Sequence, residues 1–210
     1  MAAQQSVRKQ RANGVESRRR ILDAAVEIAG ERGYEGTSIA LVSAKCGLPA
    51  SSIYWHFKDK DDLIAAVIER SFETWLAAVE LPGEEAGTAL ERVTAMAVGV
   101  AKSLIDEPDF LRLGLMLALA HRPEEPRGRA VFLQVRDIAA RRIADMLTTL
   151  IPQLPADAAA LVTTYAVAGA DGLFIAHEIG GDSVDLLRLF ELHARLMFDA
   201  ATRLAAEGTR

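Results

Sequence analysis

The sequence contains a single cysteine, Cys46, among 210 residues. One cysteine excludes an intramolecular disulfide and a cysteine metal cluster, and it fits the reducing interior of a cell. We expect Cys46 to be a small buried hydrophobe rather than a redox sensor. No secretory signal is expected, because no basic start precedes an apolar run and a cleavage site. Apolar runs such as residues 115–120 are far shorter than the roughly 18 residues of a membrane span, so we expect a cytoplasmic protein outside the membrane.

Motifs of common enzymes are missing too. None of the sixteen glutamates has a histidine three positions later, so the signature of a di-iron helical bundle is absent. The sequence has no glycine-rich phosphate loop, no His-Glu-x-x-His and no Gly-x-Ser-x-Gly. We expect no catalytic residues, no metal site and no cofactor, and an enzyme is the less favoured class.

The net charge of −5 does not favour a nucleic-acid partner, but the charge is unevenly distributed. Residues 1–62 hold ten Lys and Arg against eight Asp and Glu, whereas the remainder holds fourteen against twenty-one. A basic tip on an acidic body can bind a polyanion while the body is held away from it. The simpler alternative is a solvated basic tail ahead of an ordinary acidic protein.

Helix-forming segments separated by breaks make up the chain. All seven prolines fall where helices can begin or end, and Gly180-Gly181 marks a further break. The segments between the breaks have helical length and are rich in Ala, Leu, Arg and Glu, without strand-like alternation bounded by hairpin turns. This pattern predicts an all-α fold of about nine helices. The first helix is expected over residues 15–32, ending at Gly33.

The segment after that helix has the pattern of a helix-turn-helix. Thr37 is a suitable N-cap, Gly47 allows a tight turn, and Pro49 begins a second short helix. Two short helices joined by a glycine-containing turn are typical of DNA-binding proteins, in which the second helix enters the major groove. The side chains expected to point into the core are Leu41 or Val42, Ala44, Ile53 and Phe57.

The second short helix has chemistry that suits docking onto DNA. Its first residues are small, so the backbone can approach base edges, and serine hydroxyls can meet donors or acceptors; they are Pro49, Ala50, Ser51 and Ser52. Donors suited to phosphate oxygens follow, namely Tyr54, Trp55, His56 and Lys60. Ordinary alternatives are core aromatics for Tyr54 and Trp55 and a surface histidine for His56.

The stretch from Arg18 to Leu63 closely resembles the tetracycline-repressor (TetR) family. The resemblance is carried by Gly33-Tyr34, Thr37-Ser38, Gly47-Leu48 and above all Tyr54-Trp55-His56-Phe57 followed by Lys58 and Lys60. It implies a sequence-specific DNA-binding transcriptional regulator, a ligand-responsive repressor that binds a palindromic double-stranded operator as a homodimer. The alternative is a helical sensor or protein-interaction module that no longer binds DNA, and salt-dependent DNA binding distinguishes the two.

The resemblance also implies roles for single residues. Thr37 and Ser38 would contact phosphate at the start of the first short helix, Ala50, Ser51 and Ser52 would face bases, and Tyr54, His56 and Lys60 would clamp the backbone. Arg18, Arg19 and Arg20 stand in the first turns of a helix, where the helix dipole disfavours cations, and a DNA phosphate is one explanation for them. Solvation is the other explanation, and Arg18 is the one of the three that we place among the expected DNA-binding residues. Ala50 supplies no long base-reading side chain, so DNA shape is expected to contribute to specificity.

These inferences divide the chain into three parts. We expect a basic flexible tail over residues 1–14, a helix-turn-helix domain over 15–62, and a ligand-binding and dimerisation domain over 63–210. Two helices near the C-terminus carry surplus apolar faces, which suits a four-helix interface across a two-fold axis. A monomer whose core absorbs both faces is the alternative. The interface candidates are Leu161, Ala168, Gly172, Ile175, Leu189, Phe190, His193 and Met197.

A pocket for a small, largely apolar effector is expected among the helices of the third part. Ordinary core packing is the alternative for each of its candidate residues. The apolar candidates are Trp75, Met96, Phe110, Met116, Phe132 and Phe174, and the polar ones are His121, Tyr165, Asp171 and His177.

Overall fold

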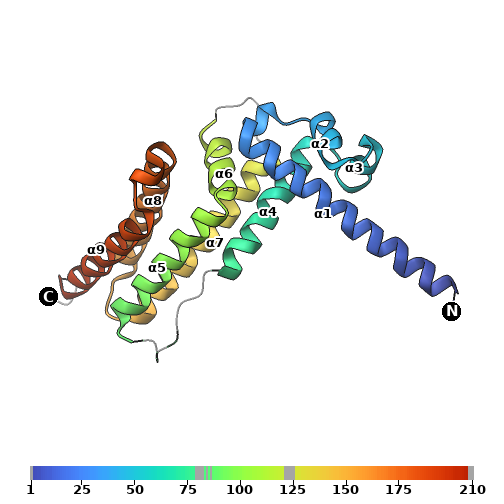
Figure 1. Cartoon of the computed structure of the whole chain (residues 1–210). Coiled ribbons are helices and arrows are strands. Elements are labelled where there is room, and N and C mark those ends of the chain that lie inside the picture. The colour runs from blue at the N-terminus through green and yellow to red at the C-terminus, as the bar shows by residue number, and fades with distance from the viewer. Residues whose placement is uncertain (1, 79–82, 84, 86, 121–125, 208–210) are drawn as a thin grey trace. The chain divides into compact units, whose positions relative to one another are not determined.

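The computed structural model describes residues 2–78, 83, 85, 87–120 and 126–207. Within these ranges the chain is helical and has no strand, which confirms the predicted all-α fold. The helices labelled in Figure 1 are α1 (Ala2–Gly36), α2 (Ile39–Cys46), α3 (Ala50–His56), α4 (Lys60–Ala78), α5 (Ala89–Asp106), α6 (Asp109–Leu119), α7 (Arg127–Leu150), α8 (Ala156–Gly180) and α9 (Leu186–Glu207). A 3-10 turn, η2 (Gly181–Ser183), lies between α8 and α9.

Proline, glycine and threonine mark the helix ends, as their backbone and side-chain chemistry predicts. Pro49 and Pro155 are the N-cap residues of α3 and α8, where a missing N–H costs no helical hydrogen bond. Gly47 ends α2 in the left-handed conformation (φ 67°) that glycine adopts without strain. Thr88 and Glu91 form a reciprocal capping box at the start of α5.

The chain divides into two compact units. Unit 1 comprises residues 1–72 and 109–134, and unit 2 comprises residues 73–108 and 135–210. Unit 1 therefore contains the helix-turn-helix together with α6 and the first parts of α4 and α7. The sequence predicted a domain boundary at residue 62. That boundary does not coincide with the division into units, and it stays a prediction.

Helix α1 is longer than predicted and is kinked near its end. It begins at Ala2, so residues 2–14, expected as a tail, are helical; good helix formers such as Ala, Gln, Arg and Lys dominate this segment. Gly33 has non-helical backbone angles (φ 67°) within α1, and the helix continues beyond it to Gly36. A Cβ atom at Gly33 would also lie 2.6 Å from Cε of Met116 on α6. The positive φ therefore favours glycine there, whereas the terminal methyl of Met116 could move aside.

The core of unit 1 follows the predicted helical periodicity. Ile21, Leu22 and Ala25 of α1 are at most 1% exposed, and α6 packs against this helix. Val42, Ile53 and Phe57 are buried as predicted, whereas Ala44 is exposed. Aromatic rings extend this core, because the ring centroid of Phe110 lies 5.8 Å from the ring centroids of both Phe72 and Phe132. These contacts fix the scaffold that carries α2 and α3.

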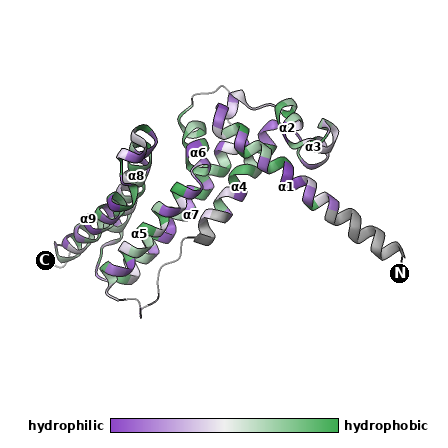
Figure 2. Cartoon of the chain, viewed as in Figure 1, coloured by the Kyte–Doolittle hydropathy of each residue, from purple (hydrophilic) through white to green (hydrophobic). Residues whose placement is uncertain are grey.

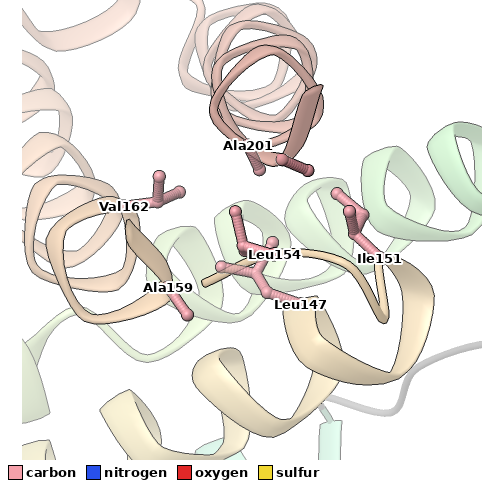
Figure 3. Packing of buried hydrophobic residues seen from close by; sticks show 7 residues of the cluster. Leu147, Ile151, Leu154, Ala159, Val162 and Ala201 are labelled. Atoms are coloured by element: carbon pink, nitrogen blue, oxygen red, sulfur yellow. The ribbon is translucent and has the colours of Figure 1, made fainter. Parts of the chain in front are cut away.

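In unit 2, α9 packs against both α5 and α8. Small side chains of α8 and α9, such as Ala159 and Ala201, let these helices approach residues from the end of α7. Figure 3 shows the side chains of this cluster directed toward one another: Leu147, Ile151, Leu154, Ala159, Val162 and Ala201. Hydrophobic and hydrophilic positions alternate around α9 (Figure 2), as expected of a helix with one face on a core.

Candidate DNA-binding interface

The N-cap of α2 is Ser38 rather than Thr37. The Ser38 hydroxyl accepts a hydrogen bond from the Leu41 amide at 3.3 Å. Thr37 is only 2% exposed, and its hydroxyl donates to the Gly33 carbonyl at 2.8 Å. The predicted cap was wrong by one residue, because the kink at Gly33 leaves a carbonyl that Thr37 satisfies. The Thr37 side chain is consequently turned inward, and Ser38 lies at the helix start; the phosphate contacts of both residues stay predictions.

Helix α3 separates its buried residues from its polar ones. Ile53 is fully buried, whereas the neighbouring Tyr54 and Trp55 are 56% and 76% exposed. The alternative of core aromatics is therefore wrong for both. Small residues occupy the start of the helix and are half-buried or exposed, namely Pro49, Ala50, Ser51 and Ser52. Two neighbouring aromatic side chains are therefore open to solvent on the outer face of α3.

His56 joins the end of α3 to α1. Its Nε2 lies 2.9 Å from the hydroxyl oxygen of Ser17, and its ring lies edge-on to Trp55 at 4.5 Å between centroids. Partial burial of the ring and, second, the charge of Arg18 lower the pKa of His56 below its ordinary value of 6.5. The imidazole is accordingly neutral at pH 7.

A surface groove of about 630 Å³ runs between α1 and α3. Hydroxyl, guanidinium and imidazole groups stand in its largely apolar walls, beside the Trp55 ring. Its lining residues are Asn13, Gly14, Glu16, Ser17, Arg20, Leu48, Ser51, Ser52, Trp55 and His56. The predicted residues Ser51, Ser52, Trp55 and His56 thus share one concave surface, to which α1 contributes residues that the prediction did not include.

Three consecutive arginines of α1 have three different environments. The Arg18 guanidinium lies 5.4 Å from the ring centroid of Phe57, a cation–π geometry. Arg19 forms ion pairs with Glu16 and Asp23, at 2.7 and 3.2 Å. Arg20 donates from Nη2 to the Cys46 carbonyl at 2.5 Å. Of the three, Arg18 was the one predicted in the interface.

Lys60, at the start of α4, is held by Tyr34. Its ammonium lies 4.1 Å from the centroid of the Tyr34 ring and donates to the Tyr34 carbonyl at 3.1 Å. The carboxylate of Glu35 lies at 4.0 Å. The Lys60 side chain is 28% exposed, so its charge still reaches solvent on the same unit as α3.

The predicted effector residues do not gather in one unit. Phe110, Met116 and Phe132 belong to unit 1, where the two phenylalanines are buried core residues and Met116 is 47% exposed. His121 lies outside the described residues. The others belong to unit 2: Trp75, Met96, Tyr165, Asp171, Phe174 and His177.

Within unit 2 these candidates differ in environment. Phe174 is 2% exposed, whereas Tyr165 is 64% exposed and points away from the interior of its unit. The Asp171 carboxylate is engaged by the Arg136 guanidinium through two hydrogen bonds, at 2.8 and 2.6 Å. His177 contacts the Val184 carbonyl through Nδ1 at 3.0 Å. Trp75 and Met96 are half-buried.

The predicted interface residues of α8 form an exposed apolar stripe. Leu161 and Ile175 are 64% and 40% exposed, and Ala168 and Gly172 lie exposed between them. Tyr165 and Ile179 extend the same stripe. By length and composition, residues 156–183 also form a helix able to cross a membrane, the one such helix among the described residues.

The predicted interface residues of α9 mostly face inward. Phe190 is 2% exposed, Met197 packs against the core of unit 2, and His193 contacts the Ala166 carbonyl of α8 at 2.9 Å. Leu189 is half-buried. The exposed apolar residues of α9 are instead Leu192 and Leu196, at 52% and 53%. Phe190, His193 and Met197 thus pack within unit 2. Leu192 and Leu196 were not among the predicted residues, and an interface through α9 stays a prediction.

Among the described residues, no group of three or more His, Cys, Asp or Glu side chains is placed to hold a metal ion. Cys46 is buried and forms no disulfide, as expected of a small hydrophobe.

Part of the chain is similar in sequence to known proteins. Residues 21–67 match the family of bacterial regulatory proteins called the tetR family. The HTH-type transcriptional regulator AcrR of Shigella flexneri is 31% identical over 102 residues, which cover 48% of this chain and 47% of that relative. The chain thus matches about half the length of this curated relative.

Solved structures share the fold. FadR from Bacillus subtilis, a transcriptional regulator solved in complex with stearoyl-CoA, superposes with a TM-score of 0.72 at 19% identity, covering 86% of this chain and 97% of that one. SmeT, the repressor of the Stenotrophomonas maltophilia multidrug efflux pump SmeDEF, gives a TM-score of 0.68 at 20% identity, covering 87% and 89%. These matched proteins are regulators and not enzymes. Residues 21–67 are therefore similar to the tetR family of bacterial regulatory proteins, and the fold of the chain is that of these solved regulators.

Proposed function

We propose that this chain is a transcriptional regulator that binds an operator in double-stranded DNA through α3 and the groove beside it. The observation that carries the proposal is the exposure of Tyr54 and Trp55 on a helix whose Ile53 is buried. Ser51 and Ser52 line the same groove and supply hydroxyls that can meet base edges. Ser38 at the start of α2 and Lys60 at the start of α4 supply a hydroxyl and a charge for phosphates.

Selection of bound duplexes from a random pool tests this proposal. The selected duplex and a shuffled duplex of equal length are then titrated across a salt series. A recovered palindrome with a steep salt dependence is the expected result, because each neutralised phosphate releases counterions. No bound duplex at any salt would favour the alternative, a sensor or interaction module that has lost DNA binding.

A homodimer is part of the proposal. The α8 stripe of Leu161, Tyr165, Ala168 and Ile175 is exposed on a single chain, and small residues within it permit close approach of another helix. Leu192 and Leu196 of α9 add exposed apolar surface in the same unit. A two-fold interface of four helices would cover both faces and would present two recognition helices to two half-sites. Sedimentation of the purified chain measures the state directly.

We also infer that a small-molecule effector controls DNA binding. A cytoplasmic location of the protein is part of the same proposal. FadR, which shares the fold, was solved with stearoyl-CoA, and this supports a largely apolar ligand class for the present chain. An effector shifts the equilibrium only by its preference for the DNA-free conformation. Release of the selected duplex by stearoyl-CoA, with free CoA as the control, tests an acyl ligand. Equal behaviour of the two compounds would exclude that class.

A further inference from the structure

The turn between α2 and α3 is held from both sides by side chains. On one side, Arg20 of α1 donates to the carbonyl of Cys46, the last residue of α2, at 2.5 Å. On the other, the Ser43 hydroxyl donates to the Leu48 carbonyl at 2.7 Å. Carbonyls at a helix C-terminus lack intrahelical partners, and a cation there interacts favourably with the helix dipole. The Arg20 bond is thus a charged cap supplied by another helix.

Gly47 lies at the centre of this arrangement. It is left-handed (φ 67°), and a Cβ atom on it would lie 3.4 Å from Nη2 of Arg20. Its amide donates to the Ser43 carbonyl at 3.0 Å, and the Ser52 amide donates to the Pro49 carbonyl at 2.9 Å. The path of the chain from α2 into the first turn of α3 therefore depends on contacts made by Arg20 and Ser43.

Arg20 contacts the turn between α2 and α3, and in this it differs from Arg19. The Arg19 guanidinium is paired with Glu16 and Asp23 of its own helix and contacts nothing in the turn. Both arginines carry one positive charge on α1, so Arg19 provides a matched control for the charge of Arg20.

We propose that Arg20 is a positioning residue for operator recognition: it orients α3 through the Cys46 carbonyl, with Ser43 holding the other side of the turn. The proposal rests on the proposed DNA binding. A phosphate contact by the same guanidinium is the competing role, and the two roles predict different salt behaviour. A phosphate contact weakens binding to all sequences and contributes about one unit to the salt slope, whereas an orienting contact affects the matched sequence.

The test uses the full chain with Arg20→Ala, Arg20→Lys, Ser43→Ala and Arg19→Ala. Each variant is titrated with the selected duplex and with the shuffled duplex across a salt series. For Arg20→Ala we expect affinity for the selected duplex to fall on the order of tenfold, the value typical of a lost charged hydrogen bond. Affinity for the shuffled duplex and the salt slope should stay unchanged. Ser43→Ala should act in the same direction, and Arg20→Lys should recover part of the loss.

Amide hydrogen exchange on the DNA-free chain gives a second readout that does not depend on an operator. Arg20→Ala should speed exchange at Gly47 and Ser52, while Arg19→Ala leaves both rates unchanged. Unchanged rates in Arg20→Ala would overturn the proposal. Equal loss on both duplexes with a smaller salt slope would overturn it as well, in favour of a phosphate contact. Failure of the unsubstituted chain to bind either duplex would instead refute the proposed function.

Discussion

The carboxylate of Asp61, on α4, accepts hydrogen bonds from the backbone amides of Arg127 and Gly128, at 2.6 and 3.3 Å. These amides belong to the first turn of α7, where N–H groups lack intrahelical partners. Asp61 thus caps a helix that begins 66 residues later in the chain. The neighbouring Asp62 pairs with the Arg127 guanidinium, so two consecutive carboxylates join α4 to α7 within unit 1.

Loss of this cap should destabilise unit 1. We expect Asp61→Ala to lower the free energy of unfolding by about 1–2 kcal/mol, the usual value of an N-cap side chain. Chemical denaturation followed by circular dichroism measures it. Asp137→Ala is the matched control, because Asp137 forms an exposed pair with Arg141 one turn away on α7, and such pairs contribute little. Similar losses in the two variants would contradict a capping role for Asp61.

Local patterns in the sequence predicted the buried residues of short helices better than the roles of single polar groups. Val42, Ile53 and Phe57 follow helical periodicity and are buried. Thr37 and Ser38 are both good caps, and only the kink at Gly33 decides between them. Arg20 and Cys46 are 26 residues apart, and no local pattern links a guanidinium to that carbonyl.

Helix α9 shows why the exposed face of an apolar helix was harder to predict. It carries two apolar stripes, one with Phe190 and Met197 and another with Leu192 and Leu196. Either stripe satisfies the helical period. The packing of α9 on both α5 and α8 selects the first as the inner face, and that packing depends on residues distant in the sequence. Helix α8 likewise has two apolar faces, and the one expected to meet a partner, with Leu161 and Ile175, is exposed.

Gly114 on α6 should not tolerate a side chain. A Cβ atom there would overlap the ring of Phe132, which is fully buried. We expect Gly114→Ala to destabilise the chain by about 1–3 kcal/mol through overpacking. The double variant Gly114→Ala with Phe132→Leu should lose less than the sum of the single losses, since the smaller side chain relieves the overlap. Additive losses in denaturation experiments would show that the two residues do not compete for space.

The pKa of His56 should make stability depend on pH in the mildly acidic range. The folded chain lowers the pKa of this histidine below 6.5, mainly by partial burial and then by Arg18. The unfolded chain therefore binds the proton more readily, so the contribution of neutral His56 is complete above pH 6.5 and is lost as the pH falls toward the folded pKa. Between pH 7.5 and 5 we expect the denaturation midpoint to fall less in His56→Gln than in the unsubstituted chain, because the variant lacks this contribution.

Nuclear magnetic resonance titration of the His56 ring checks the cause of its lowered pKa. The pKa in the folded chain should lie below 6.5, and Arg18→Gln should raise it by removing a like charge. A pKa above 6.5 would contradict the assignment of burial as the main cause.

Gly172 allows the proposed dimer to be tested without disturbing the fold of one chain. A Cβ atom on Gly172 would have no atom within 4 Å, so a larger side chain fits the isolated chain. On the α8 stripe, however, it would prevent the close approach of a second helix. We expect Gly172→Leu to shift the chain toward a monomer in sedimentation experiments with unchanged helix content. Gly172→Ala is the conservative control, and a wild-type-like dimer in Gly172→Leu would exclude this stripe as the interface.

In the proposed DNA complex, substitutions of Lys60 and Tyr54 should reveal phosphate binding, whereas substitution of Ser51 should reveal sequence readout. Lys60 offers a charge beside the Tyr34 ring, and removing it should weaken the selected and the shuffled duplex equally while lowering the salt slope by about one. Tyr54→Phe should also weaken both duplexes equally, because it removes one hydroxyl donor to phosphate.

Ser51 lies at the exposed start of α3. In the proposed DNA complex its hydroxyl would face base edges rather than phosphates. Ser51→Ala should therefore change the sequence preference in a repeated selection and leave the salt slope unchanged. A uniform loss on both duplexes would instead assign Ser51 to the phosphate backbone, and base readout would then have to come from other residues of the groove, with Ser52 the nearest hydroxyl on the same helix.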